Sequence, residues 1–239
     1  MCRKAVGLIF AAALLWTGCA TTKKDTGSPA ACDCTRQVRV PDKAFRTFLV
    51  DNGYAKVSRK RTMKPTAEGC ALRSINCYNQ GIGSLQGIEM FPQLEQLTCS
   101  DNPIGELDLT VLPRLRRFYC NNVPLRRIYI HGCDNLSYIE LGYTKLRELD
   151  LTGCAGLDSL FCIFAPIRVI DLSPCPRLKT LYLRGTYIEE IDLRNNPMFH
   201  LLHGQDSRLC SVVITPAQYD ADVLLSVGDS VKVRVIPED

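Results

Sequence analysis

The sequence predicts a repeat solenoid built mostly of short parallel β-strands, with a helical cap before the repeats and a β cap after them. Two observations predict it. Apolar residues recur every 21 residues in two series offset by ten, and each series member opens the pattern apolar-x-x-apolar-x-apolar. The 239 residues are 46% hydrophobic and 23% charged, which is ordinary for one or two globular domains and excludes a collagen-like fibre or wholesale disorder.

Each of the two series marks one side of the repeating coil. Because apolar and polar residues alternate within the pattern, each side is a short strand with one face inward. One unit cannot bury that face alone, so units stack about 4.8 Å apart around a shared apolar column. We expect five to six coils over residues 72–214. The series are Leu94, Leu115, Leu136, Leu157, Leu178 and Phe199, and Ile104, Leu125, Leu146, Ile167, Ile188 and Leu209.

The repeat also has a recognisable wording. Residues 94–110 read LEQLTCSDNPIGELDLT, and residues 146–152 and 167–173 repeat its second half as LRELDLT and IRVIDLS. This pattern resembles the leucine-rich repeat family, specifically bacterial internalin-like surface proteins with 21-residue, cysteine-containing repeats. The resemblance implies a leucine-rich repeat fold and a role in recognition without catalysis. It does not specify the ligand.

The N-terminus has the order of an export signal. Arg3 and Lys4 precede the apolar run 5–16, which is too short for a membrane span of about 20 residues. Thr17-Gly18-Cys19 follows and resembles the cleavage site of a bacterial lipoprotein signal. The resemblance implies a signal peptide at 1–18, lipid attachment at Cys19, and an exported, membrane-anchored lipoprotein of a bacterial envelope, at the outer membrane or cell surface. Ordinary cleavage after Ala20, which leaves a soluble secreted protein, is the alternative.

Three further segments complete the predicted domain organisation. Residues 19–35 are a polar, lipidated tether, residues 36–71 an N-terminal cap, and residues 215–239 a C-terminal cap with a strand over 231–235. Within the N-terminal cap, residues 40–50 place Ala44, Phe45, Phe48 and Leu49 on one helical face. The nine Lys and Arg against two Asp in residues 36–64 are interpreted as a solvated helical face. The repeats are acidic overall, which argues against a nucleic-acid partner.

The cysteines follow the same period. Cys99, Cys120 and Cys162 share an inward column with Leu141 and Leu183, and Cys133, Cys154 and Cys175 form a second series at a turn. Stacked cysteines point the same way, which strains a disulfide, so we expect two reduced ladders. In an oxidising compartment, Cys70 with Cys77 and Cys32 with Cys34 are the disulfide candidates. A zinc site at Cys32-Asp33-Cys34 or at His200, His203 and Cys210 lacks the usual ligand spacing, so no metal is expected.

Two outward columns flank the first strand of each coil and hold the candidate binding residues. They read Thr98, Tyr119, Glu140, Phe161, Tyr182 and His203, and Gln96, Arg117, Tyr138, Ser159, Thr180 and Leu201. Tyr, Phe and Arg are typical of recognition surfaces. We expect Arg117, Tyr119, Tyr138, Phe161, Tyr182 and His203 to bind a protein or glycan ligand. The alternative is that aromatic residues on adjacent strands only stabilise the sheet.

The second strand carries aspartates in register. Asp108, Asp150, Asp171 and Asp192 align with Tyr129, and we expect Arg126, Arg147 and Arg168 in a nearby column to compensate their repulsion. Calcium is the alternative interpretation, but it takes six to eight oxygen ligands and one column supplies too few.

Catalytic motifs are missing from the sequence. It has no G-x-S-x-G, H-E-x-x-H or phosphate-binding G-x-x-x-x-G-K-[ST] motif, and only three His. We therefore expect a protein without enzymatic activity or cofactor, which binds its partner through the outward sheet face, as in adhesion. A periplasm-facing scaffold or assembly factor is the alternative.

Overall fold

The computed structural model describes residues 33, 35–59, 62–221 and 223–237. The chain divides into two units, residues 1–31 and 32–239, and all described residues belong to the second. The expected signal peptide at 1–18, the lipid-attachment residue Cys19 and the candidate disulfide pair Cys32 and Cys34 lie outside the described residues. Among the described residues, every helix is too short or too polar to span a bilayer.

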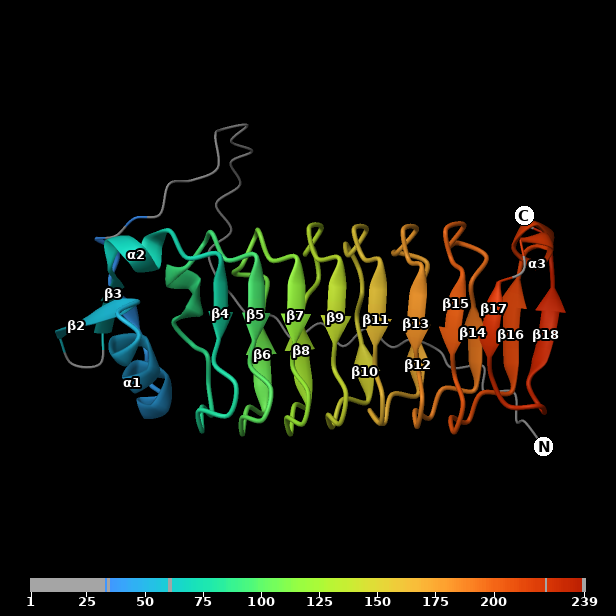
Figure 1. The fold of residues 1–239 in the computed structure, drawn as a ribbon, viewed down its shortest axis with the longest axis horizontal. Helices are drawn as coiled ribbons and strands as arrows, with labels where there is room; N and C mark the ends of the chain where they lie inside the picture. The colour runs from blue at the N-terminus through green and yellow to red at the C-terminus, as the bar shows by residue number, and fades with distance from the viewer. Residues whose placement is uncertain (1–32, 34, 60–61, 222, 238–239) are drawn as a thin grey trace, which may run out of the picture. The chain divides into compact units, whose positions relative to one another are not determined.

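One long parallel sheet runs through the repeats, with its strands side by side in chain order (Figure 1). Each strand pairs in register with the next, so that Leu160 lies between Ile139 and Leu181. The strands are β4 (Ser74–Asn76), β5 (Gln96–Thr98), β7 (Arg117–Tyr119), β9 (Tyr138–Glu140), β11 (Ser159–Phe161), β13 (Thr180–Tyr182), β15 (Leu201–His203) and β17 (Leu224–Ser226).

The other side of each coil forms shorter parallel pairings. The strands are β6 (Glu106–Asp108), β8 (Arg127–Tyr129), β10 (Glu148–Leu149), β12 (Val169–Ile170), β14 (Glu190–Asp192), β16 (Ser211–Ile214) and β18 (Lys232–Val235). They pair as β6-β8, β10-β12 and β14-β16-β18. The expected strand over 231–235 is therefore present as β18, parallel to β16.

The number of coils exceeds the sequence expectation of five to six, because the long sheet has eight strands. The end strands were missed because they break the 21-residue step. Ile75 pairs with Leu97, 22 residues later, and Leu202 with Leu225, 23 residues later. The chain there loops further before it returns to the sheet.

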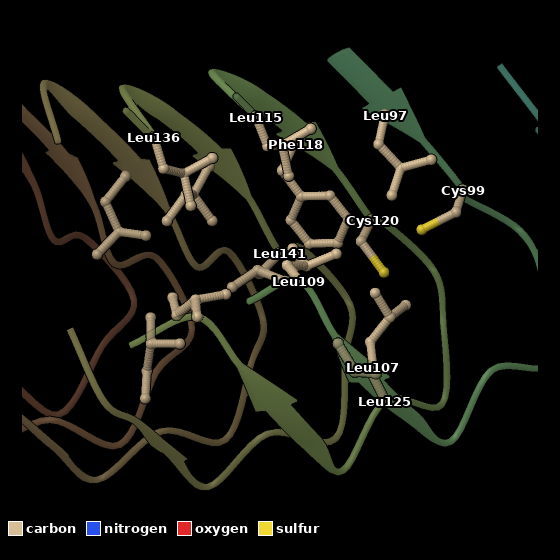
Figure 2. Close-up of a cluster of buried hydrophobic side chains, with 14 of the residues drawn as sticks. Leu97, Cys99, Leu107, Leu109, Leu115, Phe118, Cys120, Leu125, Leu136 and Leu141 are labelled. Atoms are coloured by element: carbon tan, nitrogen blue, oxygen red, sulfur yellow. The ribbon is translucent and has the colours of Figure 1, made fainter. Parts of the chain in front are cut away.

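The core is the apolar column between the two sides of the coils. All six residues of the first series, from Leu94 to Phe199, are buried, and so are all six of the second. Figure 2 shows Phe118 and its leucine neighbours pointing inward from both sides. Full burial of one such side chain contributes about 1.5–3 kcal/mol, so the column accounts for the stability of a coil that could not fold alone.

The cysteine columns are reduced, as expected. Cys77, Cys99, Cys120, Cys133, Cys154, Cys162, Cys175 and Cys210 are free. In Figure 2 the sulfurs of Cys99 and Cys120 lie side by side on neighbouring coils. The expected pairing of Cys70 with Cys77 is wrong, because Cys70 is in a disulfide whereas Cys77 is free. Cys77 is fully buried in the inward column, and its thiol donates to the Thr98 carbonyl at 3.3 Å.

The second cysteine series acts as a ladder of hydrogen-bond donors. The thiols of Cys133 and Cys154 donate to the carbonyls of Leu109 and Ile130, each 24 residues earlier, at 3.7 and 3.3 Å. Asn196 continues the series through its Nδ2, which donates to the Leu172 carbonyl at 2.9 Å. A small buried donor can thus satisfy the carbonyl of the preceding coil, whether it is a thiol or an amide.

The expected helix of the N-terminal cap is α1 (Lys43–Asp51), with Phe45, Phe48 and Leu49 buried against the first coils. The carboxylate of Asp42 caps it by accepting from the Phe45 amide at 2.8 Å.

The interpretation of the whole basic segment as a helical face is wrong. Beyond α1 it forms an antiparallel sheet of β1 (Val38–Arg39), β2 (Ala55–Arg59) and β3 (Thr62–Pro65). Met63 is fully buried there, whereas Lys56 and Lys64 point to solvent, so their charges follow a strand period. Three short helices complete the fold: α2 (Ala67–Cys70), η1 (Ile88–Met90) and α3 (Pro216–Asp220).

Candidate partner-binding face

The outward face of the long sheet holds the residues singled out in the sequence. In each strand the central residue is buried and its two neighbours point outward, partly exposed in most strands. The register places Tyr119, Glu140, Phe161, Tyr182 and His203 in one column, and Arg117, Tyr138, Ser159, Thr180 and Leu201 in the next. Both columns are therefore as the sequence predicts.

Five rings on this face form one continuous stack. The ring centres of Phe161 and Tyr182 are 4.7 Å apart, and those of Tyr182 and His203 are 5.2 Å apart. Tyr138 lies 5.1 Å from Tyr119 on one side and 5.1 Å from Phe161 on the other. We name these five residues, Tyr119, Tyr138, Phe161, Tyr182 and His203, the ring ladder. Each aromatic contact of this kind contributes about 0.5–1.5 kcal/mol beyond its buried area.

Tyr138 completes the ring ladder from the wrong column. The ring column has Glu140 at this level, and Tyr138 leans across from the neighbouring column to fill the space between Tyr119 and Phe161. Its hydroxyl lies 3.2 Å from Oε2 of Glu140 and donates to it. Burial, followed by the negative charge of Glu140, raises the pKa of Tyr138 to about 12, so the phenol remains protonated at neutral pH.

Glu140 is itself held by the turn beside the sheet. Nδ2 of Asn121 donates to Oε1 of Glu140 at 2.8 Å, and Oδ1 of Asn121 accepts from the Gly142 amide at 2.7 Å. Asn121 also receives support, because its amide donates to the hydroxyl of Ser100 at 2.9 Å. The position of the Tyr138 ring therefore rests on three coils.

Arg117, the sixth predicted residue, lies at the edge of this arrangement. It occupies the column of Tyr138, one strand earlier, and is exposed. Its Nε donates to Oε1 of Gln96 at 3.1 Å. The structure thus brings five of the six predicted residues into one stack and leaves Arg117 beside its beginning.

A depression of about 350 Å³ lies next to the first ring of the ladder. It is lined by Tyr78, Gln96, Thr98, Ser100, Asp101, Tyr119 and Asn121. Sequence reasoning did not single out Tyr78, Asp101 or Asn121. Asn121 and Asp101 occupy corresponding turns in successive coils, so a comparison of turn positions as well as strand positions would have found them.

The aspartate column on the other side is structural. Asp108, Asp150 and Asp171 each accept from the backbone amide two residues later at 2.9 Å. Asp192 accepts from the amide of Arg194 and pairs with its guanidinium at 2.9 Å. The expected compensation by Arg126, Arg147 and Arg168 is wrong, because each carboxylate already caps its own turn. No group of three metal-ligating side chains occurs among the described residues, the predicted aspartates included.

Comparison with solved structures identifies the fold. The functional domain of InlJ from Listeria monocytogenes, whose structure includes a cysteine ladder, matches 89% of the chain at 20% identity and a TM-score of 0.54. The fold is that of a leucine-rich repeat solenoid. The internalin InlF from the same species matches 81% of the chain at 18% identity and a TM-score of 0.50, and the TLR13–ssRNA13 complex matches 69% at 18% identity and 0.51.

These likenesses concern the fold. The chain spans 50% of the InlJ domain, 30% of the TLR13 chain and 68% of InlF. No family model and no curated protein matches the sequence. The predicted fold class, a leucine-rich repeat solenoid with internalin-like coils, is therefore confirmed by the structure itself and by these neighbours. In this solenoid the ring ladder lies on the long, regular sheet and not on the short strand pairs.

Proposed function

We propose that this protein is a non-catalytic, exported envelope lipoprotein that binds a protein partner through the ring ladder. The observation that carries the proposal is the ladder itself: five stacked rings, all partly exposed, on the one continuous sheet. Sheet support alone does not require Tyr138 to lean across two columns so that the stack remains unbroken. Tyrosine and arginine on a rigid surface are typical of protein-binding hot spots.

The geometry of the rings favours a protein over a glycan. Each inner ring is covered by a ring on either side, so the ladder presents ring edges and hydroxyls outward instead of open ring faces. A sugar or a base that stacks needs an open face. A protein surface can pack apolar side chains against the edges and hydrogen-bond to the phenols. A protein is therefore the partner that this face fits best.

The binding role is tested with a double substitution on the ladder. Tyr119→Ala with Tyr182→Ala removes two rings, and Tyr129→Ala with Tyr219→Ala removes two exposed tyrosines elsewhere. We expect proteins cross-linked to the wild type on cells to be lost from the first variant and retained by the second, while both unfold cooperatively. Equal cross-linking by the ladder variant contradicts the proposal and leaves the rings as sheet support.

The proposed envelope location rests on the N-terminal sequence, with Cys19 as the acylated residue. Growth with labelled palmitate should label the wild type but not Cys19→Ala. Protease treatment of intact cells then tells the two possible orientations apart. Cleavage on intact cells supports a cell-surface binder, whereas cleavage only after lysis supports the periplasm-facing scaffold.

A further inference from the structure

One turn of each coil holds a residue in the left-handed backbone conformation. Seven successive coils show φ between 51° and 72° there: Asn79, Asp101, Asn122, Tyr143, Phe164, Gly185 and Asp206. Glycine, asparagine and aspartate tolerate this conformation, and five of the seven residues are of these types. Tyr143 and Phe164 are bulky residues for which it is strained.

Core packing does not explain these two aromatic residues, because both side chains point outward. Tyr143 is 60% exposed and Phe164 is 40% exposed. Their rings stack with centres 5.1 Å apart. The next coil has Gly185 at this position, where a Cβ atom would lie 2.3 Å from Cδ1 of Phe164. The absence of a side chain at Gly185 therefore makes room for the Phe164 ring.

Arginines cover the remaining ring faces. Cζ of Arg184 lies 5.5 Å from the ring centre of Phe164. One coil further along the same turns, Tyr187 lies between two arginines, with Arg168 at 5.5 Å and Arg208 at 4.4 Å from its ring centre. We name this surface the arginine–aromatic ridge. It consists of Tyr143, Phe164, Arg168, Arg184, Tyr187 and Arg208.

The ridge carries a positive charge. Lys145 and Arg147 are exposed in the same turns and add to its three arginines, whereas Glu189 and Asp206 are the acidic side chains there. Arg184 pairs with Asp206 at 2.9 Å. Arg168 and Arg208 have no ion pair among the described residues. A guanidinium stacked on a ring keeps its in-plane N–H groups free to bind a carboxylate in a bidentate manner.

We propose that the arginine–aromatic ridge is a second binding surface, which takes an acidic segment of a protein partner. Its charge complements aspartate and glutamate side chains, and clustered arginines are a common means of recognising acidic motifs. The covered ring faces leave little room for stacked bases or sugars, which argues against a nucleic acid or a glycan. Strained residues that serve no core are typical of functional sites. The ridge lies on turns beside the sheet and stands independently of the ring ladder.

The test is selection from a displayed library of random peptides on the purified full chain. We expect the enriched peptides to be rich in Asp and Glu, and their affinity to fall with rising salt. Arg184→Ala with Arg208→Ala should weaken them about tenfold, or about 1.4 kcal/mol. Arg127→Ala with Arg177→Ala, two arginines elsewhere on the solenoid, should leave the affinity unchanged. The ring-ladder variant should also retain these peptides, which separates a failure of this surface from a failure of the ladder.

A second variant keeps the test free of folding artefacts. Tyr143→Asn with Phe164→Asn replaces both rings by a residue that suits the left-handed conformation, so this variant should keep its melting temperature while it loses the peptides. Enrichment of neutral peptides, or equal binding by the Arg184 and Arg208 variant, overturns the proposal. Heparin or oligothymidine that binds the ridge more tightly than any selected peptide overturns it in favour of a glycan or a nucleic acid.

Discussion

The ring of Tyr138 occupies the space above Glu140, and its hydroxyl donates to the Glu140 carboxylate at 3.2 Å. This pair keeps the ring ladder continuous at the one level where the ring column lacks an aromatic residue. Tyr138→Ser removes two ring contacts, with Tyr119 and Phe161, and should lower the free energy of unfolding by about 1–3 kcal/mol. Adding Glu140→Tyr to that variant puts a ring back into the column and should restore most of the loss. Urea denaturation of both single variants and the double variant measures the coupling. Additive effects would show that the rings do not act as one stack.

The space above Gly185 gives a prediction with a closely matched control. Gly185 and Gly132 both have φ of 72°, so alanine adds a similar backbone cost at each. At Gly132 a new Cβ meets nothing within 4 Å, whereas at Gly185 it meets the Phe164 ring. Gly185→Ala should therefore displace Phe164 and weaken acidic-peptide binding about tenfold, or about 1.4 kcal/mol. Gly132→Ala should lower the melting temperature by a similar or smaller amount and leave binding intact. Equal binding by both variants would mean that the Phe164 ring does not contribute.

The 21-residue period predicts the core and the outward columns because every coil has the same length and register. Leu97, Phe118 and Ile139 had to align once the step was recognised. The period cannot predict how a side chain leans, because it fixes only the position of the Cα atom. Tyr138 and Glu140 were therefore placed in the right columns without their contact.

Three further features escaped sequence reasoning for identifiable reasons. Ile75 and Leu225 lie after longer loops, which hid the end coils. The strand alternation around Met63 was masked by the surrounding positive charges. Tyr143 and Phe164 follow Asn122 at the same turn position, and only a comparison of turns would have shown that they replace residues suited to a positive φ.

The buried thiols predict a loss of stability at alkaline pH. Burial raises the pKa of Cys162 from its ordinary 9.0 to about 12. The folded state thus keeps the proton more tightly than the unfolded state. The stabilising contribution is complete below pH 9 and is lost as the pH rises from about 9 to about 12, by about 1.4 kcal/mol per pH unit for each such thiol. Cys162→Ala should make the alkaline fall in melting temperature shallower. Leu160→Ala, which removes a buried residue without a thiol, should lower the melting temperature equally at all pH values. An unchanged alkaline slope in Cys162→Ala would contradict this assignment.

The donor ladder at the turns predicts that a thiol can replace an amide. Nδ2 of Asn196 donates to the carbonyls of Leu172 and Cys175 at 2.9 and 2.8 Å, whereas its Oδ1 has no hydrogen-bond partner within the described residues. Asn196→Ala leaves buried carbonyls unsatisfied and should cost about 2–4 kcal/mol, since each such group costs about 1–3 kcal/mol. Asn196→Cys should recover part of this loss, because the thiol of Cys154 already donates to the carbonyl in the corresponding position. Only the donor has a role at Asn196, so losing the amide oxygen adds no cost. Asn195→Ala, at the exposed neighbour, is the control and should change the free energy of unfolding little. If Asn196→Cys is no more stable than Asn196→Ala in urea denaturation, the cysteines of this series are not donors and fill space alone.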